Sequence, residues 1–227
     1  MTDEKRSMFR KDFHTPAVAD YVEKLMAADE GFAAHVPEVM AARNLGAARL
    51  SAAEGRILET LVRTVGARKA VEIGTLAGYS GHWIARGMPE GGRLYTLEKD
   101  PACVSAAKEC FAQSNLSRKV TVLEGAALEN LKTLSKLAPF DFCFIDADEE
   151  NYPAYLRWAA LNLRPGGMAA ASGAFFKGKV CLEGGEPGEN ARARAMREFF
   201  HVFFDGDRFV SAAVIPTGEG MAIGIKA

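Results

Sequence analysis

The chain has 227 residues, of which 48% are hydrophobic, and this is enough apolar content for one large domain with a single core. Its 28 Lys and Arg residues almost balance 29 Asp and Glu residues, so the net charge of −1 argues against nucleic acid or an anionic membrane as a partner. The sequence has no signal-peptide pattern, no membrane-spanning apolar run and no C-x-x-C pair among its four cysteines. We therefore expect a cytoplasmic protein with reduced thiols.

The first 65 residues are predicted to form a helical cap over a ligand site. Apolar residues recur at helical spacing over Thr15–Met26, and a second helix or irregular cover is expected over Glu30–Asn44. Ser51 is expected to be the N-cap of a third helix, because Glu54 follows three positions later and completes a capping-box pattern. This part of the chain carries no recognisable catalytic motif.

Strand and helix patterns alternate through residues 66–227. The predicted strands are Ala70–Ile73, Arg93–Leu97, Lys119–Leu123, Phe140–Ile145 and Met168–Ala171. The predicted helices are Tyr79–Arg86, Pro101–Ser114, Ala127–Leu137, Tyr152–Asn162 and Asn190–Phe200. This alternation predicts a parallel sheet with helices on both faces.

Two further strand patterns lie near the end of the chain. The segments Arg208–Ile215 and Met221–Ile225 are joined by a short connection with Pro216 and two glycines, which favours a hairpin and an antiparallel end to the sheet. The glycine-rich stretch Lys177–Asn190 is predicted to be a long loop, of the kind that serves as a lid or binding loop. The whole chain, residues 1–227, is interpreted as a single α/β domain.

The most informative stretch is Ala70–Ser80, which is typical of a buried strand, a glycine turn and the start of a helix. Gly74 and Gly78 permit a backbone geometry and a close approach that a Cβ would block. The first N–H groups of the following helix favour an anionic ligand group beside this turn. The spacing matches neither G-x-G-x-x-G nor G-x-x-x-x-G-K-[ST], so a nicotinamide-dependent oxidoreductase is a weak alternative.

Polar and small residues follow the neighbouring strand patterns. Glu98 ends the second strand, where a carboxylate can accept hydrogen bonds from both ribose hydroxyls of a nucleoside. Glu124-Gly125-Ala126 ends the third strand, where small residues would let an adenine lie against the backbone. Asp146 follows the fourth strand and is expected at the same sheet edge. Each of these residues also has a purely structural interpretation, as a solvated strand end, a small turn or a helix cap.

Taken together, these motifs resemble those of the S-adenosylmethionine-dependent O-methyltransferases of the catechol and caffeoyl-CoA type. The resemblance extends from about Ala47 to the C-terminus. It is carried by Glu72-Ile73-Gly74-Thr75-x-x-Gly78-Tyr79-Ser80, Glu98, Ile145-Asp146-Ala147-Asp148, Asn151-Tyr152, Leu163-Arg164-Pro165-Gly166-Gly167 and Gly218-Glu219-Gly220. It implies a Rossmann-like class I methyltransferase fold, with a seven-stranded, mostly parallel sheet, a C-terminal antiparallel hairpin and an N-terminal helical cap. It also implies a homodimer.

The resemblance further implies that S-adenosylmethionine is the cofactor. Glu98 would take its ribose hydroxyls, Ala126 would lie next to its adenine, and Asp146 would face its amino group. Glu72, Gly74 and the backbone as far as Ser80 would hold its methionine end. The cofactor-binding residues predicted in this way are Glu72, Gly74, Thr75, Gly78, Tyr79, Ser80, Glu98, Ala126, Asp146 and Tyr152.

The resembled family binds a divalent cation with the Asp at position 146 and with an Asp-Asn pair directly after the fifth strand, and it carries a Lys base three residues after that Asp. In this chain Ser172 and Gly173 stand at the positions of the Asp-Asn pair, and Glu149 stands at the position of the Lys. A hydroxyl and a glycine are poor ligands for a hard cation. We therefore predict that no divalent metal is bound.

Without a metal, side chains must activate the acceptor hydroxyl. Glu149 or Asp148 is a candidate general base, and Lys177 or Lys179 is a candidate electrostatic partner for a phenolate. The catalytic residues that we predict are Asp146, Glu149 and Lys177. Further candidate bases outside every motif are His14, His35, His82 and His201.

The leading hypothesis is a metal-independent methyltransferase that acts on the oxygen of a small, for example aromatic, acceptor. The N-terminal cap and the Lys177–Asn190 loop would form the acceptor pocket. The alternative hypothesis is an S-adenosylmethionine-binding sensor or scaffold that has lost catalysis, because two metal-ligand positions and the base position have changed together.

Overall fold

The computed structural model describes residues 15–27, 31–46, 50–182 and 187–227. The candidate base His14 and part of the predicted Lys177–Asn190 loop lie outside the described residues. Within the described ranges, no helix combines the length and the apolar character that a membrane crossing needs.

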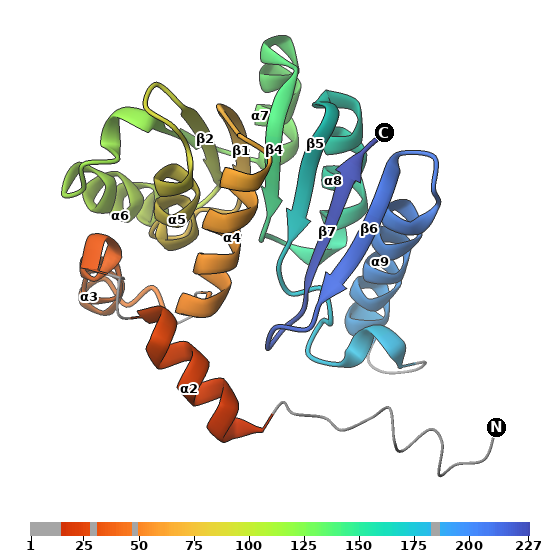
Figure 1. Cartoon of the computed structure of the whole chain (residues 1–227), viewed down its shortest axis with the longest axis horizontal. Helices are drawn as coiled ribbons and strands as arrows, with labels where there is room; N and C mark the ends of the chain where they lie inside the picture. Colours follow the sequence, from red (N-terminus) through yellow and green to blue (C-terminus); the bar gives the residue numbers. More distant parts are fainter. Residues whose placement is uncertain (1–14, 28–30, 47–49, 183–186) are drawn as a thin grey trace.

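The centre of the molecule is a seven-stranded sheet with the strand order β3-β2-β1-β4-β5-β7-β6 (Figure 1). The strands are β1 (Lys69–Ile73), β2 (Arg93–Glu98), β3 (Val120–Glu124), β4 (Phe140–Ile145), β5 (Leu163–Ala171), β6 (Phe209–Ile215) and β7 (Met221–Lys226). The first five strands pair in parallel, and β7 runs antiparallel to both of its neighbours. The predicted fold, including the C-terminal hairpin, is confirmed. The strand order reverses between β1 and β4, which is where open sheets of this kind bind ligands.

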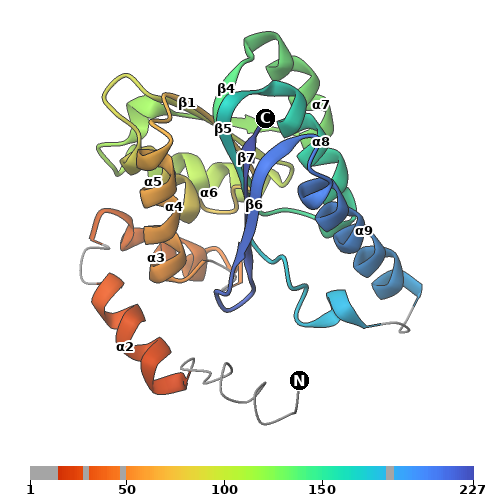
Figure 2. The same cartoon turned by 45° about the vertical axis from the view of Figure 1, so that its right-hand side comes forward.

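Helices cover both faces of the sheet, as the alternating pattern predicts (Figures 1 and 2). The helices of the N-terminal part are α2 (Pro16–Ala27), α3 (His35–Ala42) and α4 (Ala52–Thr64). Those of the core are α5 (Tyr79–Gly87), α6 (Pro101–Ala112), α7 (Ala127–Leu134), α8 (Tyr152–Asn162) and α9 (Pro187–Phe204). One apolar layer packs under α3–α6 and a second under α7–α9. Strand β4 serves both layers, because Phe142 and Phe144 belong to the first and Cys143 and Ile145 to the second.

The largest differences from the predicted element boundaries are in β5 and α9. Strand β5 begins at Leu163 rather than Met168, because Leu163 already pairs with Phe140 before the register shifts. Pro165 and Gly166 have the sequence pattern of a turn. In the structure this segment is part of the strand, and Arg164 forms an ion pair with Asp141 at an Nε–Oδ1 distance of 2.7 Å. Helix α9 begins at Pro187, inside the stretch that we predicted as a loop.

Helix α4 is the part of the N-terminal cap that is most firmly joined to the core. The predicted capping box is present, with the Glu54 N–H donating to Ser51 Oγ at 3.2 Å and the Ser51 N–H donating to Glu54 Oε2 at 3.0 Å. Gly55 lies against the indole of Trp83 in α5, so closely that a Cβ there would be 2.2 Å from Trp83 Nε1. A glycine at this position therefore sets the distance between α4 and α5.

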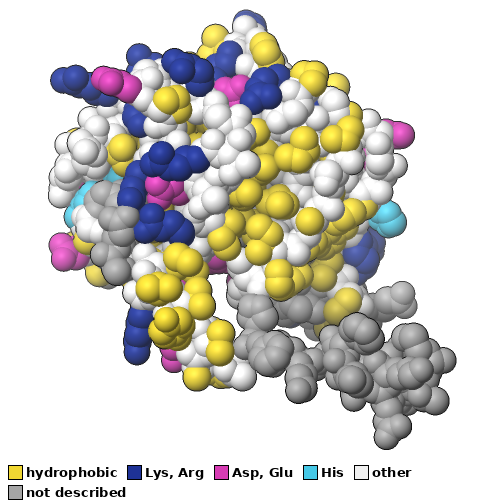
Figure 3. All heavy atoms as spheres, viewed as in Figure 1, with side chains coloured by type: hydrophobic (Ala, Val, Ile, Leu, Met, Phe, Trp, Pro, Cys, Tyr) yellow, Lys and Arg dark blue, Asp and Glu magenta, His cyan; other side chains and the backbone are white. Residues whose placement is uncertain are grey.

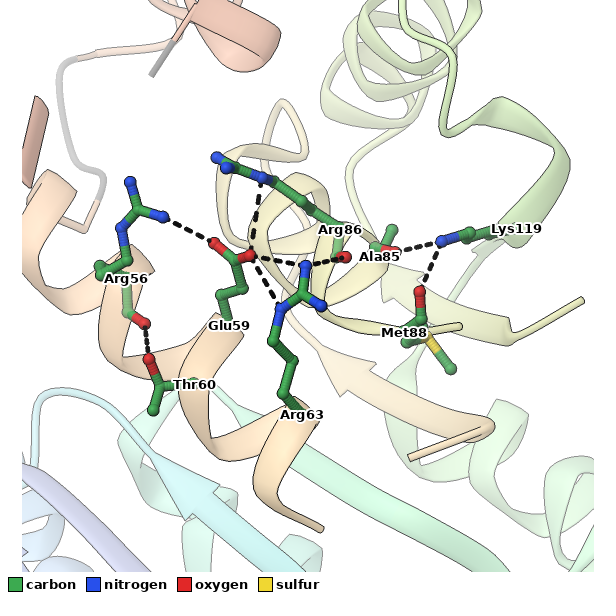
Figure 4. Close-up of polar contacts among 8 residues, drawn as sticks. All are labelled: Arg56, Glu59, Thr60, Arg63, Ala85, Arg86, Met88 and Lys119. Atoms are coloured by element: carbon green, nitrogen blue, oxygen red, sulfur yellow. Dashed lines mark hydrogen bonds and ion pairs between the residues drawn. The ribbon is translucent and has the colours of Figure 1, made fainter. Parts of the chain in front are cut away.

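A buried carboxylate also links α4 to α5 (Figure 4). Glu59 Oε1 lies 3.0 Å from Arg63 Nη2 and 3.6 Å from Arg86 Nε, and its Oε2 accepts from Arg56 Nη1 at 3.2 Å. Three guanidinium groups around one carboxylate satisfy a charge that would be costly to bury alone.

Helix α2 extends away from the core (Figure 1). It contacts α4 through Glu23, whose carboxylate accepts the N–H groups of Ala52 at 2.7 Å and Ala53 at 3.1 Å. Its residues Tyr21 and Leu25 are 67% and 61% exposed. The cap predicted over residues 1–65 thus covers the core through α3 and α4, whereas α2 presents an apolar face to solvent.

Candidate functional site

A cavity of about 960 Å³ opens at the carboxyl ends of the parallel strands. Its wall combines the turn after β1, the strand ends of β2 and β3, the segments after β4 and β5, and the turn between β6 and β7. The lining residues are Met40, Leu50, Glu54, Gly74, Thr75, Leu76, Ala77, Tyr79, Ser80, Leu97, Glu98, Lys99, Gly125, Ala126, Ala127, Leu128, Asp146, Ala147, Asp148, Glu149, Asn151, Tyr155, Ser172, Gly173, Phe176, Lys177 and Glu219. Most of the predicted site residues therefore meet around one space.

The glycine turn after β1 packs directly against the segment after β4. Gly74 has a φ of +94°, and a Cβ there would lie 1.9 Å from the backbone oxygen of Asp146. Gly78 has a φ of +88° and is the N-cap residue of α5. Only glycine satisfies both the backbone geometry and the close approach at Gly74. The structure therefore agrees with the prediction that Gly74 and Gly78 provide a backbone geometry and a close approach that a Cβ would block.

Glu98 joins β2 to the glycine turn. Its Oε2 accepts the N–H groups of Leu76 at 2.9 Å and Thr75 at 3.2 Å, while its Oε1 accepts the N–H of Asp100 at 2.9 Å. Glu98 lines the cavity, and its carboxylate oxygens retain lone pairs for a ligand hydroxyl. The carboxylate thus shapes the turn as well as offering acceptors to a ligand.

Glu72 is fully buried in β1, beneath the turn rather than in the cavity wall. Its Oε2 accepts from the Thr96 hydroxyl at 2.6 Å, but its Oε1 has no hydrogen-bond partner among the described residues. Burial raises the pKa of Glu72 to about 7; the nearby hydroxyl groups of Ser80 and Thr96 oppose this shift, and the charges of Asp146 and Glu98 add to it. Glu72 is therefore placed to support the turn from below.

Asp146 follows β4 and is held by its own N–H, which donates to Ile73 O at 2.8 Å. Asp146 is exposed to the cavity, which it lines among many neighbouring protein atoms. These surroundings, followed by the charges of Glu54 and Glu149, raise the pKa of Asp146 to about 7. The carboxylates of Glu54, from α4, and of Glu149 thus both act on Asp146.

The two tyrosines of α8 have different environments. The predicted cofactor-binding residue Tyr152 is buried outside the cavity wall, and its hydroxyl donates to Ser172 O at 2.9 Å. Tyr155, one turn later, lines the cavity and donates to Asp148 Oδ1 at 2.8 Å. We did not predict Tyr155, although its spacing of three residues from Tyr152 on one helix was a usable signal.

The segment after β5 forms the far side of the cavity. Ser172 is held by its N–H, which donates to Ile145 O at 3.0 Å, and Gly173 follows with a φ of +66°. Phe176 and Lys177 are non-glycine residues with φ values of +47° and +52°, and both line the cavity. Left-handed backbone at such residues stores strain and is concentrated at functional sites. The Lys177 N–H donates to Glu219 Oε2 at 3.3 Å, which ties this segment to the turn between β6 and β7.

The other candidate bases lie away from the cavity wall. The Nε2–H of His35 donates to Cys110 O at 2.8 Å, and the His35 ring lies edge-on to that of His82. His82 Nδ1 is 2.6 Å from Gly78 O, and burial lowers the pKa of His82 to about 4. His201 is exposed on α9, and Lys179 pairs with Glu189. Of the two predicted lysines, Lys177 is therefore the one at the cavity.

Comparison with known proteins agrees with this geometry. The O-methyltransferase family model matches residues 24–227. The chain belongs to the O-methyltransferase family. A catechol O-methyltransferase of Niastella koreensis is 31% identical over 92% of this chain and 96% of its own length, and one of Mycobacterium tuberculosis is 32% identical over 80% and 82%. The O-methyltransferase of Bacillus cereus, solved in complex with SAH, has 34% identity and a TM-score of 0.86, covering 93% of this chain and 97% of that one.

The predicted family and fold are thus confirmed for this O-methyltransferase. SAH is the demethylated form of S-adenosylmethionine, so the cofactor predicted for this site is of the kind found in the Bacillus cereus relative. As for metals, the described residues contain no group of three His, Cys, Asp or Glu side chains placed to hold one ion. That the enzyme binds no divalent metal stays a prediction, which rests on the identity of Ser172 and Gly173.

Proposed function

We propose that this protein is an S-adenosylmethionine-dependent O-methyltransferase that methylates the hydroxyl of a small acceptor without a divalent metal. The observation that carries the proposal is that the glycine turn and Glu98 line the same cavity as Asp146, Glu149 and Lys177. In this proposal the cofactor binds beside the glycine turn and Glu98. The acceptor binds in the remaining part of the cavity, between the N-terminal cap and the segment after β5.

The residues present fit S-adenosylmethionine. Gly74 leaves a cradle at the turn that a Cβ would fill, Glu98 offers acceptors for ribose hydroxyls, and Gly125-Ala126 leaves room for a flat base. Asp146 would pair with the ammonium group, and the N-terminus of α5 favours the carboxylate. When bound, the cofactor supplies a methyl group that is electrophilic because it is attached to a sulfonium.

Residues of this chain would position and deprotonate the acceptor hydroxyl. Asp148 already accepts hydrogen bonds from Tyr155 and Asn151, which favours its neighbour Glu149 as the base that takes the hydroxyl proton. Lys177, held at the cavity by its strained backbone, would stabilise the developing oxyanion. The bound cofactor would supply its methyl group to the acceptor oxygen, and the electron pair of the broken carbon–sulfur bond would stay on sulfur.

The test is a calorimetric titration of S-adenosylmethionine and SAH, once with EDTA and once with magnesium, followed by an acceptor screen in both buffers. Equal cofactor binding and equal methyl transfer in the two buffers are expected. Absence of cofactor binding would contradict the proposal as a whole. Activity that needs magnesium would contradict only its metal-free part. Cofactor binding without turnover on any phenol, hydroxyl or amine would favour the sensor or scaffold, which the changes at Ser172, Gly173 and Glu149 motivate.

We also propose that the enzyme is a homodimer. Figure 3 shows hydrophobic side chains gathered over α2, over α4 and over the strands beside it. The half-buried residues Ile57 and Leu61 of α4 and Ile223 and Ile225 of β7 pack against the same apolar layer and remain open to solvent on their outer side. Light scattering on Ile223→Glu should show a monomer, whereas Leu161→Glu, at an 84% exposed position on α8, should leave the dimer intact. A wild-type monomer would contradict this proposal.

We place the protein in the cytoplasm. All four cysteines are free thiols in the structure, and Cys103, Cys110 and Cys143 are buried. Unpaired cysteines suit a reducing compartment. Fractionation of the source cells should recover the protein with cytoplasmic markers, and recovery from an oxidising compartment would contradict this assignment.

A further inference from the structure

Glu72 is a fully buried carboxyl group that has no part in the reaction proposed above. It lies in β1 beneath the glycine turn, and its side chain is 0% exposed. Among the described residues, no lysine, arginine or histidine forms an ion pair with it, whereas the negative charges of Asp146 and Glu98 act on it. A carboxyl group that is buried near other carboxylates, without a cationic partner, keeps its proton because the charged form is costly. Glu72 therefore has the surroundings of a neutral acid.

A chain of hydroxyl groups determines which oxygen of Glu72 can carry this proton. The Thr96 hydroxyl donates to Glu72 Oε2 at 2.6 Å, and Thr75 Oγ1 lies 2.5 Å from Thr96 Oγ1. Because the Thr96 hydrogen points to Glu72, Thr75 is the donor in the second contact. Oε2 is thus an acceptor, whereas Oε1 has no hydrogen-bond partner in the part of the chain that the structure describes. A proton on Oε1 makes this oxygen a donor.

Ser80 connects the buried acid to the cavity. It lies in the first turn of α5 and lines the cavity, and its hydroxyl is close enough to Glu72 to act on the proton of that carboxyl. An ionised Glu72 would attract the hydroxyl hydrogen inward and repel an anionic group above the turn. A neutral Glu72 can instead donate to the hydroxyl oxygen, so that the hydroxyl hydrogen is available to a ligand in the cavity.

Resting on the cofactor placement proposed above, we propose that Glu72 is a positioning residue, which as a neutral acid turns the Ser80 hydroxyl toward the carboxylate of the bound cofactor. The N–H groups at the start of α5 and the Ser80 hydroxyl then face that carboxylate together, with no negative charge beneath them. Ionisation of Glu72 ends this arrangement. Because burial, with the charges of Asp146 and Glu98, raises the pKa of Glu72 to about 7, the cofactor affinity falls as the pH rises through neutrality.

A second group near Glu72 titrates in the same range and has to be separated from it. The residues that surround Glu72 are Thr96 and Glu98 of β2, Asp146 after β4, and Ser80 and Gly81 of α5. The pKa of Asp146 is also raised to about 7, and Asp146 faces the ammonium group of the cofactor in our proposal. Two ligands that share the ammonium and differ in the carboxylate therefore distinguish Glu72 from Asp146.

The experiment compares SAH with its decarboxylated analogue, S-adenosyl-3-thiopropylamine, by calorimetric titration at pH 6, 7 and 8 with EDTA present. At pH 8 only about one molecule in ten has a neutral Glu72, so the affinity for SAH should fall about tenfold more than that for the analogue between pH 6 and pH 8. Titrations at pH 8 in buffers of different ionisation enthalpy should show that SAH takes up about one proton more on binding than the analogue does.

Three variants test the assignment to Glu72 and Ser80. Glu72→Gln keeps a donor and an acceptor at every pH, so it should bind SAH within about threefold of the wild type at pH 6 and lose the pH-dependent difference between the ligands. Ser80→Ala should weaken SAH binding about fivefold at pH 6 and leave the analogue unaffected. The matched control is Glu90→Gln, at an exposed position outside the cavity lining, which should keep the wild-type pH profile.

Failure of the inference can be told apart from failure of the proposed function. If SAH does not bind at any pH, the cofactor placement is wrong and the inference falls with it. If SAH binds but its affinity relative to the analogue is the same at pH 6 and pH 8, only the inference is overturned. It is also overturned if Glu72→Gln keeps the wild-type pH dependence, or if Ser80→Ala weakens both ligands equally. Should Glu72→Gln not fold, the wild-type comparison and Ser80→Ala decide the matter.

Discussion

The two halves of the cavity are built in different ways. The cofactor half consists of the glycine turn and the ends of β1, β2 and β3, within about fifty residues of continuous chain, and its parts are held by backbone hydrogen bonds to Glu98. The acceptor half takes Met40, Leu50 and Glu54 from the cap, Phe176 and Lys177 from the segment after β5, and Glu219 from the last turn. The cofactor half is thus built from one continuous stretch of chain, whereas the acceptor half forms only when segments distant in sequence pack together.

This difference gives a physical reason for the contrast that the sequence predicts, in which the cofactor residues follow the family pattern and Ser172, Gly173 and Glu149 depart from it. A turn that must place backbone against backbone tolerates few side chains. A pocket wall made from separate loops can change residue by residue without disturbing the sheet. The following predictions test this contrast, beginning with the largest expected effect.

Gly74→Ala should abolish cofactor binding or reduce it by about a thousandfold. The new Cβ would lie 1.9 Å from Asp146 O, and backbone cannot move aside as a flexible side chain can. Gly66→Ala is the matched control, because Gly66 also has a positive φ, of +64°, but has no atom within 4 Å of its ideal Cβ position. That control should lose only about 1 kcal/mol of stability. Calorimetric titration of S-adenosylmethionine measures both variants, and near-normal binding by Gly74→Ala would contradict the close packing of the turn.

The buried carboxylate of Glu72 should make stability depend on pH. Its folded-state pKa is raised to about 7 from an ordinary value of 4.5, so the folded protein holds a proton that the unfolded chain loses as the pH rises. The free energy of unfolding should therefore fall between about pH 4.5 and pH 7, by up to about 3 kcal/mol from this group. Urea unfolding across this range should show the fall in the wild type and a flatter profile in Glu72→Gln. Parallel profiles would mean that Glu72 does not titrate as described.

Gly55→Ala should affect the acceptor half and spare the cofactor half. The added Cβ would collide with the Trp83 indole and push α4 away from α5, at a cost of about 2 kcal/mol in stability. Because Glu54 is the preceding residue, acceptor affinity should fall severalfold, while SAH affinity of the folded protein should remain within about twofold. An equal loss of both affinities would show that the two halves are coupled through α4.

Glu98→Gln should weaken cofactor binding by about tenfold. Gln keeps one oxygen for the N–H groups of the turn but replaces the other acceptor, which faces the ribose in our proposal, with a donor. Glu124→Gln is the control, since Glu124 pairs in register with Glu98 at the end of β3 but lies outside the cavity lining. Titration with S-adenosylmethionine distinguishes the two, and equal affinities would argue against Glu98 as the ribose partner.

The sequence predicted the parallel core well because its signals are local. Alternating strand and helix patterns, the Ser51–Glu54 capping box and the glycine turn each depend on residues within one or two turns of each other. Its errors were also local in origin. The start of β5 was missed because Pro165 and Gly166 have the pattern of a turn, whereas pairing with β4 and the ion pair between Arg164 and Asp141 extend the strand across them.

By itself, then, the sequence determined the fold class and the family, and it predicted which strand-end residues gather at one edge of the sheet, because the carboxyl ends of parallel strands must meet there. Only the tertiary structure decided which residues share the acceptor space. It brought Glu54 from α4 to the carboxylates after β4, and it placed Tyr155 rather than Tyr152 at the cavity. It also left Lys179 paired with Glu189 and Lys177 at the wall. The physical reason is that contacts between segments a hundred residues apart depend on packing, which no local pattern records.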